Sequence, residues 1–280
     1  MKYSVFTVML PELSPQEAIH ELKKAGYDGV EWRVTAIDPA KQEEPPSFWG
    51  NNRCTVDTQS SEEDILSLKA ETELAGLEIP ALACYLQCGD VEGTARGMQI
   101  AQWFGASAIR VGVPMYNRSK RYQELLEEGR SYLEEVQKLS RQYGVQGWIE
   151  IHMNNIASSA SLAHRLVEGF DPEHIGVIYD PGNMVYEGYE QYRMGLELLG
   201  PYLAHVHVKN AHWVRTNDPN RHIWQADSCP VSEGVANWKQ IVDDLKTVGY
   251  DRWLSFEDFS RSGTGEELLA RNLQYMKSLV

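Results

Sequence analysis

Basic residues are scarce in this sequence, and the chain is strongly acidic. Its 280 residues include 26 Lys and Arg against 40 Asp and Glu, which gives a formal net charge of −14. A protein that binds nucleic acid usually carries a basic surface that neutralises phosphates. The charge balance therefore argues against a nucleic-acid partner.

Cysteines and long apolar runs are also scarce. The chain contains only Cys54, Cys84, Cys88 and Cys229. Four cysteines in a chain of this length do not form the disulfide framework of a small secreted protein, and no second pair completes a zinc knuckle. No run approaches the ~20 apolar residues that cross a bilayer. The N-terminal stretch is too short and too polar at its flanks for a signal peptide. We therefore expect a cytoplasmic protein without a membrane partner.

What the chain does contain is a regular alternation of short apolar runs with amphipathic runs. Strands are predicted at residues 3–9, 29–34, 79–85, 108–113, 147–152, 175–180, 203–208 and 253–258. A helix is predicted after each strand. The first two are expected to begin at capping boxes, Ser14 with Glu17 and Ser60 with Glu63.

Eight such units predict the fold. Alternating β and α segments indicate a parallel sheet, and eight units in 280 residues indicate closure into a single (β/α)8 TIM barrel over residues 1–280. The alternative is an open doubly wound sheet, which usually has a glycine-rich phosphate-binding turn after its first strand. The turn here reads LPELSPQE and contains no glycine. The closed barrel is therefore preferred.

Two connections that follow expected strands are unusually long, at residues 35–60 and 210–235. In a barrel both lie on the C-terminal face, where enzymes of this architecture place their sites. Their aromatic and basic residues include Trp49, Trp213, Arg215, Arg221, His222 and Trp224. We expect residues 38–59 and 210–234 to cover the same mouth, with their tryptophans excluding water or stacking on a ligand.

Acidic and histidine side chains lie at the ends of several expected strands. Four of them belong to consecutive strands five to eight: Glu150, Asp180, His207 and Glu257. Three carboxylates at one barrel mouth repel one another unless a divalent cation neutralises them. One imidazole with three carboxylates suits Mn²⁺ best, and also Mg²⁺, Co²⁺ or Zn²⁺. We expect one such ion on these four residues; the alternative is that each is a separate ion-paired or capping residue.

Several motifs together resemble the xylose isomerase-like TIM barrels. The resemblance rests on Glu150, then DPGN at 180–183, HVHVKN at 205–210 and SFE at 255–257. That superfamily includes sugar isomerases and epimerases, inosose and dehydroshikimate dehydratases, and endonuclease IV-type enzymes. The resemblance implies that Glu150, Asp180, His207 and Glu257 are the metal ligands of its ketose 3-epimerase branch. Asn183 and Trp213 stand where that branch has a substrate-binding His and an Arg, which weakens the case for a free ketose.

The expected activity is a metal-dependent isomerisation or epimerisation of a keto-sugar or related polyol. Glu150 and Glu257 would remove and return a proton through an enediolate. A dehydratase, or a lyase that cleaves 3-oxo-glycosides, would use the same residues and stays open. A phosphodiesterase with three zinc ions and a non-catalytic sugar-binding barrel are less favoured.

The remaining candidates concern the substrate and the surroundings of the metal ligands. Substrate contacts are expected from His152, Asn183, Lys209, Arg215, Trp49 and Trp213. Lys209 would neutralise an oxyanion or be a simple loop cation. His205 would support a metal ligand or be a packed strand histidine. Glu31 would pair with Arg33 or Arg110, or contact substrate. The acidic chain favours an uncharged carbohydrate, and a homo-oligomer is left open.

Overall fold

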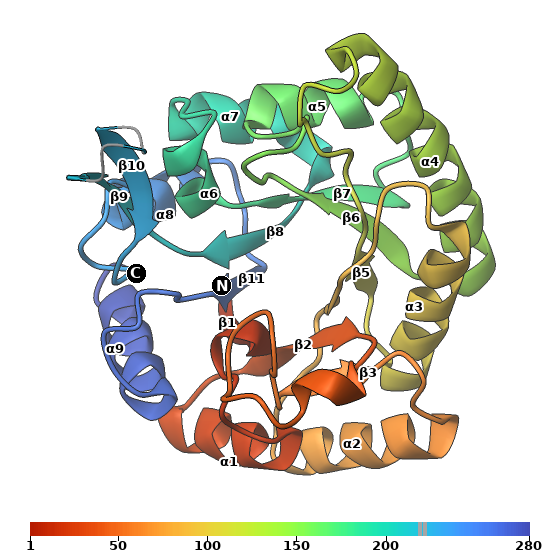
Figure 1. Ribbon diagram of the computed structural model, residues 1–280, viewed down its shortest axis with the longest axis vertical. Coiled ribbons are helices and arrows are strands. Elements are labelled where there is room, and N and C mark those ends of the chain that lie inside the picture. The colour runs from red at the N-terminus through yellow and green to blue at the C-terminus, as the bar shows by residue number, and fades with distance from the viewer. Residues whose placement is uncertain (218–219, 221–222) are drawn as a thin grey trace.

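The alternating segments fold into a closed parallel barrel, seen end-on in Figure 1. In this computed structural model, residues 1–217, 220 and 223–280 are described. The barrel strands are β1 (Lys2–Phe6), β2 (Gly29–Thr35), β4 (Leu82–Cys84), β5 (Ala108–Arg110), β6 (Gln146–Glu150), β7 (Ile175–Tyr179), β8 (Leu203–Val208) and β11 (Trp253–Phe256). Because β1 pairs in parallel with both β2 and β11, the sheet closes on itself. The predicted (β/α)8 barrel is confirmed.

Helices surround the strands as an outer ring (Figure 1). The ring consists of α1 (Pro15–Ala25), α2 (Glu62–Leu74), α3 (Val91–Phe104), α4 (Tyr122–Tyr143), α5 (Ala160–Val167), α7 (Tyr192–Leu199), α8 (Trp238–Thr247) and α9 (Gly265–Lys277). A short helix that the sequence pattern did not predict, α6 (Pro181–Tyr186), follows β7 directly. Single 3-10 turns are η1 (Thr7–Met9), η2 (Pro39–Lys41) and η3 (Gly200–Tyr202). No helix in the described part of the chain combines the length and apolar character needed to cross a membrane.

The helix starts show how local chemistry sets the boundaries. Helix α1 begins at the predicted box, in which Ser14 and Glu17 each accept a hydrogen bond from the other's backbone N–H. The second box was predicted one residue too early. Ser60 donates its backbone N–H to the Asp57 carbonyl, so the helix begins after Ser61, whose side chain caps Asp64.

The apolar core lies between the barrel and the helix ring. Trp32 of β2 and Trp238 of α8 are among its largest fully buried side chains. The interior of the barrel, by contrast, holds the charged and polar side chains of Glu31, His205 and His207, all of them fully buried. Burying such groups is costly unless they bond to one another, so their pairing matters for the site described below.

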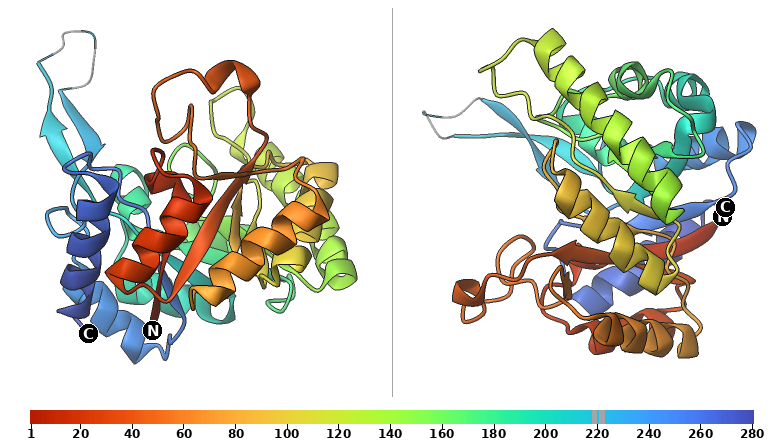
Figure 2. Two further views of the ribbon diagram at one scale, coloured as in Figure 1. Left: turned by 90° about the horizontal axis from the view of Figure 1, so that it is seen from below. Right: turned by 90° about the vertical axis from the view of Figure 1, so that its right-hand side faces the viewer.

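The two long connections lie at the same end of the barrel (Figure 2). The first adds a short strand, β3 (Thr55–Asp57), which pairs with β2. The second forms an antiparallel hairpin of β9 (Ala211–Arg215) and β10 (Trp224–Ser228), which projects from the body of the molecule. The sequence pattern predicted neither feature. Arg221 and His222 lie outside the described residues.

Candidate metal and substrate site

Four side chains of types that can ligate a metal ion converge at the C-terminal end of the barrel. Glu150 is the last residue of β6, His207 lies in β8, and Asp180 and Glu257 directly follow β7 and β11. Each offers one ligand atom, and these atoms all lie within 4.8 Å of one another. All four side chains are buried. The carboxyl ends of neighbouring parallel strands meet at one end of a barrel, which is why residues far apart in sequence come together.

The segment after β7 places Asp180. Asp180 caps α6, because its Oδ1 accepts the backbone N–H of Asn183 at 2.9 Å. Pro181 occupies the first helical position, where its missing N–H costs nothing. Gly182 allows a close approach: a Cβ there would lie 2.7 Å from the backbone carbonyl carbon of Lys209. This turn therefore holds Asp180 against the neighbouring strand end.

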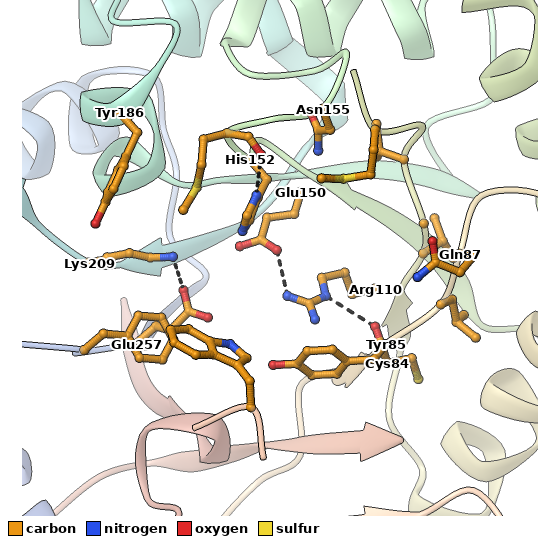
Figure 3. Close-up of a pocket in the computed structure, with 18 of the residues that line it drawn as sticks. Cys84, Tyr85, Gln87, Arg110, Glu150, His152, Asn155, Tyr186, Lys209 and Glu257 are labelled. Atoms are coloured by element: carbon orange, nitrogen blue, oxygen red, sulfur yellow. Dashed lines mark hydrogen bonds and ion pairs between the residues drawn. The ribbon is translucent and has the colours of Figure 1, made fainter. Parts of the chain in front are cut away.

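Two cations and an amide neutralise and orient these carboxylates. Arg110 Nη1 lies 2.7 Å from Glu150 Oε2, and Lys209 Nζ lies 2.6 Å from Glu257 Oε2 (Figure 3). The same Lys209 ammonium is 3.2 Å from Asp180 Oδ2. Asn183 donates to Asp180 Oδ2 at 2.7 Å and accepts from Lys209 Nζ at 2.9 Å. The carboxylates are thus held in place by a network of ion pairs and hydrogen bonds.

The pKa values of these side chains determine how many protons a bound metal ion would displace. Burial raises the pKa of Glu150, but Arg110 and His207 outweigh it and hold that pKa well below its usual range. Burial raises the pKa of Asp180 to about 6 although Lys209 opposes the shift. Burial lowers the pKa of His207, yet Glu31 and Glu150 outweigh it and raise that pKa well above its usual value. A positively charged His207 thus stands where a cation would bind.

Below the four ligands, Glu31 joins two histidines. His207 Nδ1 is 3.1 Å from Glu150 Oε1, and its Nε2 is 3.3 Å from Glu31 Oε1. His205 Nε2 is 3.1 Å from Glu31 Oε2, and its ring stacks on Trp148. The predicted ion pair of Glu31 with an arginine is wrong. In the structure Arg33 donates to Thr55 and Arg110 donates to Glu150. The imidazoles of His205 and His207 are the partners of Glu31 instead.

A cavity of about 420 Å³ opens above this cluster. Residues along its wall include Trp49, Tyr85, Arg110, Glu150, His152, Tyr186, Lys209, Glu257 and Phe259. His152 Nδ1 lies 2.8 Å from the Met153 carbonyl. Since a carbonyl only accepts, Nδ1 is the donor in this contact, which leaves Nε2 for another partner. Among the described residues of this wall, His152 is the only histidine.

Some of the predicted substrate residues line the cavity, and the others do not. Trp49, His152 and Lys209 line the cavity, and Trp49 packs against Phe259 with ring centroids 5.0 Å apart. Of residues 38–59, Trp49 lies at the wall of this cavity, and its role as a cover over a ligand stays a prediction. Asn183 is fully buried and bonds to Asp180 and Lys209, so the structure places it behind the carboxylates.

The structure does not bring the hairpin residues to the cavity. Trp213 and Trp224 are 49% and 58% exposed, and neither they nor Arg215 are among the described residues that line it. In the antiparallel hairpin Trp213 faces Ala226 and Arg215 faces Trp224 across the strands. These side chains therefore share one side of the hairpin, the side that carries Ser228 nearer its base. In the structure Trp213 and Trp224 do not line the cavity, and residues 210–234 contribute Ser228 to its wall. Cover of the mouth by these two tryptophans stays a prediction.

Among the wall residues that the sequence did not predict as site residues are Arg110 and Tyr85. Arg110 was considered only as a partner of Glu31, and Tyr85 was not considered. Each stands at the carboxyl end of a barrel strand, β5 and β4 respectively. That position was the available signal, because the same reasoning had selected the residues after strands five to eight.

The donor set fits a divalent metal ion. Three carboxylates and one imidazole are the hard, oxygen-rich ligands that Mn²⁺, Mg²⁺, Co²⁺ and Zn²⁺ accept. The carboxylates already gather around positive groups, Lys209, Arg110 and His207. Such a gathering of buried negative charge is stable only with cationic partners, and a metal ion would supply the same compensation at the point where the ligand atoms converge.

The fold and the site together define a class, the barrel proteins with a buried cluster of carboxylates and a histidine at the C-terminal mouth. The chain belongs to the xylose isomerase-like TIM barrel family, whose family model matches residues 19–279. The predicted membership is thereby confirmed.

Individual relatives are distant. An inosose dehydratase from Geobacillus thermodenitrificans is 24% identical over 225 residues, which cover 69% of this chain and 73% of that protein. The apo 3-keto-D-glucoside 4-epimerase YcjR from E. coli has a TM-score of 0.71 at 15% identity, over 99% of both chains. The IOLI protein with a bound zinc atom has a TM-score of 0.77 at 15% identity, over 100% of this chain and 98% of that one. At such identities structural likeness shows the fold alone.

Proposed function

We propose that the protein is a metal-dependent sugar isomerase or epimerase that transfers a proton next to a carbonyl of a keto-sugar or related polyol. The observation that carries the proposal is the convergence of four ligand atoms within 4.8 Å, two of them from carboxylates that also line a cavity. The epimerase and dehydratase names of the distant relatives support the same range of chemistry.

In this proposal Glu150, Asp180, His207 and Glu257 hold one divalent ion. When bound, the ion polarises the substrate carbonyl as a Lewis acid. Glu150 and Glu257 are the groups that exchange protons with the substrate, one as base and the other as acid, with the roles reversed in the back reaction. Both carboxylates reach the cavity wall, whereas Asp180 and His207 are fully buried, so only the first pair can touch the reacting carbon.

Other residues orient the reacting groups. Lys209 holds Glu257 and Arg110 holds Glu150 through the ion pairs described above, and both cations face the cavity. Either is positioned to donate a hydrogen bond to a substrate oxygen that gains negative charge. Trp49 offers an apolar face at the entrance. The choice of Mn²⁺, a cytoplasmic location, a single domain over residues 1–280 and a homo-oligomer stay predictions.

Solvent proton exchange tests the proposal. Metal-loaded protein is incubated in D₂O with free ketoses, inososes and 3-keto-glycosides, and deuterium at carbon is followed by NMR. We expect exchange with at least one substrate, and its loss in Glu150→Gln and Glu257→Gln. Glu134→Gln on the exposed side of α4 is the matched control. Full exchange in both site variants would refute the assignment.

A dehydratase is the second candidate, and one observation favours it. His152 lines the cavity, and an imidazolium with Nδ1 bonded to the Met153 carbonyl would donate its Nε2 proton to a leaving hydroxyl. The inosose dehydratase relative points the same way. Mass spectrometry of the product separates the candidates, because dehydration removes one water and epimerisation leaves the mass unchanged. His152→Gln should abolish only the dehydration.

A further inference from the structure

A second cavity of about 370 Å³ lies beside the first. We propose that this second cavity binds the distal ring of a two-sugar glycoside, so that the substrate is a keto-disaccharide instead of a free sugar. The proposal rests on the proposed function, because it assigns the reacting ring to the metal cavity. It extends that function by naming the substrate class and a subsite.

The two cavities share a wall. Trp49 and Tyr85 line both of them. The Tyr85 ring contacts two guanidinium groups: Arg110 of the metal cavity, 4.8 Å from the ring centroid, and Arg33 of the second cavity, 4.7 Å away. Figure 3 shows Arg110 between Glu150 and Tyr85. A ligand that crosses this aromatic wall would have one end at Glu150 and the other at Arg33.

The size of each cavity suits one small ring. Ligand cavities in proteins measure roughly 300–1,000 Å³, and these two lie near the lower end of that range at about 420 and 370 Å³. Together they reach the middle of the range. A free monosaccharide would leave the second cavity unused.

The second cavity is also lined by a buried arginine. Arg33 is 6% exposed, and its Nη1 donates to Thr55 Oγ1 at 2.5 Å. Among the described residues Arg33 makes no ion pair with a carboxylate, and its Nε, which is closed to solvent, has no hydrogen-bond partner. A charged guanidinium forms strong hydrogen bonds with oxygen acceptors. Arg33 is thus a cationic group that a bound molecule would meet at this wall.

The rest of the lining favours a sugar over a phosphate group. Asp38 and Lys41, of opposite charge, both line the second cavity near its exposed rim. The Asp38 carboxylate would repel a phosphate dianion. Sugar hydroxyl groups can instead donate hydrogen bonds to Asp38 and accept them from Lys41. Trp49 and Tyr85 supply apolar faces for the ring itself. This mixture of aromatic faces with a few donors and acceptors is typical of a small-molecule site with a polar, uncharged ligand.

The test compares a one-ring with a two-ring substrate on the metal-loaded full chain. The probes are methyl 3-keto-α-D-glucoside and 3-keto-trehalose. Proton exchange gives KM for each, and saturation-transfer NMR reports which rings touch the protein. We expect a KM for the disaccharide about tenfold lower, the effect of one hydrogen bond to a charged group, and saturation of both rings.

Two variants locate the effect. Ala36→Trp fills the second cavity from an exposed lining position, and Ala40→Trp, exposed in the same connection but outside that lining, is the control. We expect Ala36→Trp to raise the ratio of the disaccharide KM to the methyl glycoside KM about tenfold and to remove saturation of the second ring. Arg33→Lys, which keeps the charge but loses the planar guanidinium, should raise the same ratio. Thermal melting confirms that each variant is folded.

The outcomes separate this proposal from the proposed function. Equal KM values for the two probes, unchanged in Ala36→Trp, would overturn the second subsite and leave the exchange chemistry intact. Saturation confined to one ring in wild type would overturn it as well. Saturation of both rings without proton exchange would support the subsite and refute the proposed function.

Discussion

A metal ion that binds this site would have to displace a proton from His207 and, at low pH, a second one from Asp180. The pKa of His207 is raised well above its usual value because Glu31 and Glu150 outweigh its burial. Burial raises the pKa of Asp180 to about 6. At pH 7 the metal-free site therefore carries a protonated imidazole and a largely ionised Asp180. Below pH 6 Asp180 is protonated too.

We predict that metal binding releases protons and weakens as the pH falls. Since the ligands must be deprotonated to bind, about one proton should leave at pH 7 and about two at pH 5.5. Calorimetric titration of Mn²⁺ in buffers of different ionisation enthalpy counts them. A proton count near zero at both pH values would contradict the assigned ligands.

Glu31 is the second residue whose role is testable by itself. Its carboxylate bonds to His207 Nε2 while Nδ1 faces Glu150, the arrangement by which a carboxylate orients a metal-binding histidine. We predict that Glu31→Gln weakens metal binding by roughly 10–100-fold, the usual cost of losing such a partner. The metal Kd from titration measures it, and circular dichroism checks the fold. An unchanged Kd would show that Glu31 is only a structural partner of His205.

At the scale of elements, the turn between β7 and α6 joins the fold to the site. Alanine in a helix normally stabilises relative to glycine, yet a Cβ on Gly182 would approach the Lys209 backbone to 2.7 Å. We predict that Gly182→Ala costs about 1–3 kcal/mol of unfolding free energy, as overpacking does, and lowers metal affinity by displacing Asp180. Chemical denaturation and metal titration measure the two effects.

The control is Gly144→Ala at the end of α4. Gly144 has a φ of +67° and nothing within 4 Å of an added Cβ. Alanine there costs about 1–2 kcal/mol for the left-handed conformation alone and should leave metal affinity unchanged. Equal metal affinity in both variants would refute the role given to the close approach at Gly182.

The base of the β9–β10 connection is held by one side chain. Asn210 donates to the carbonyls of Val231 and Ala236 at 2.8 and 3.0 Å, and its Oδ1 accepts from the N–H groups of Ala211 and Ala236 at 2.9 Å each. We predict that Asn210→Ala accelerates hydrogen exchange in residues 211–217 and 223–236, because buried backbone groups lose partners worth about 1–3 kcal/mol each.

Asn210→Asp is the informative comparison for this prediction. It keeps the acceptor oxygen but loses both donated bonds, so exchange should rise only in part. Mass-spectrometric hydrogen exchange reads out both variants. If Asn210→Ala exchanges no faster than wild type, the side chain does not hold this connection in place.

At the scale of the whole molecule, the barrel was predictable because its signals are local and repeated. Each strand is a short apolar run and each helix has a capping residue or an apolar face, so eight units could be counted without knowing any contact. Boundaries were less accurate. The strand predicted at residues 3–9 ends at Phe6 because η1 follows it, and the capping box after Asp57 begins at Ser61 because Ser60 is used in a turn.

The position of each residue along the chain was enough to group the four side chains at the barrel mouth. Contacts that depend on the register of the strands could not be predicted. Strand ends meet at one barrel mouth, so Glu150, Asp180, His207 and Glu257 could be grouped from spacing. The residues that bond to these four side chains could not be predicted in the same way. Whether Arg110 reaches Glu150 or Glu31 depends on how the strands are staggered, and no local pattern encodes that. The direction of the β9–β10 hairpin likewise depends on pairing between distant residues.

The central claim is that these four residues hold one divalent ion. Elemental analysis of metal-loaded, dialysed protein tests it most directly, with wild type measured beside Asp180→Ala and His207→Ala. We predict one Mn²⁺ per wild-type chain and near-complete loss in both variants, while Glu134→Gln retains the ion. Wild-type protein without stoichiometric metal, or variants that keep full occupancy, would contradict the assignment.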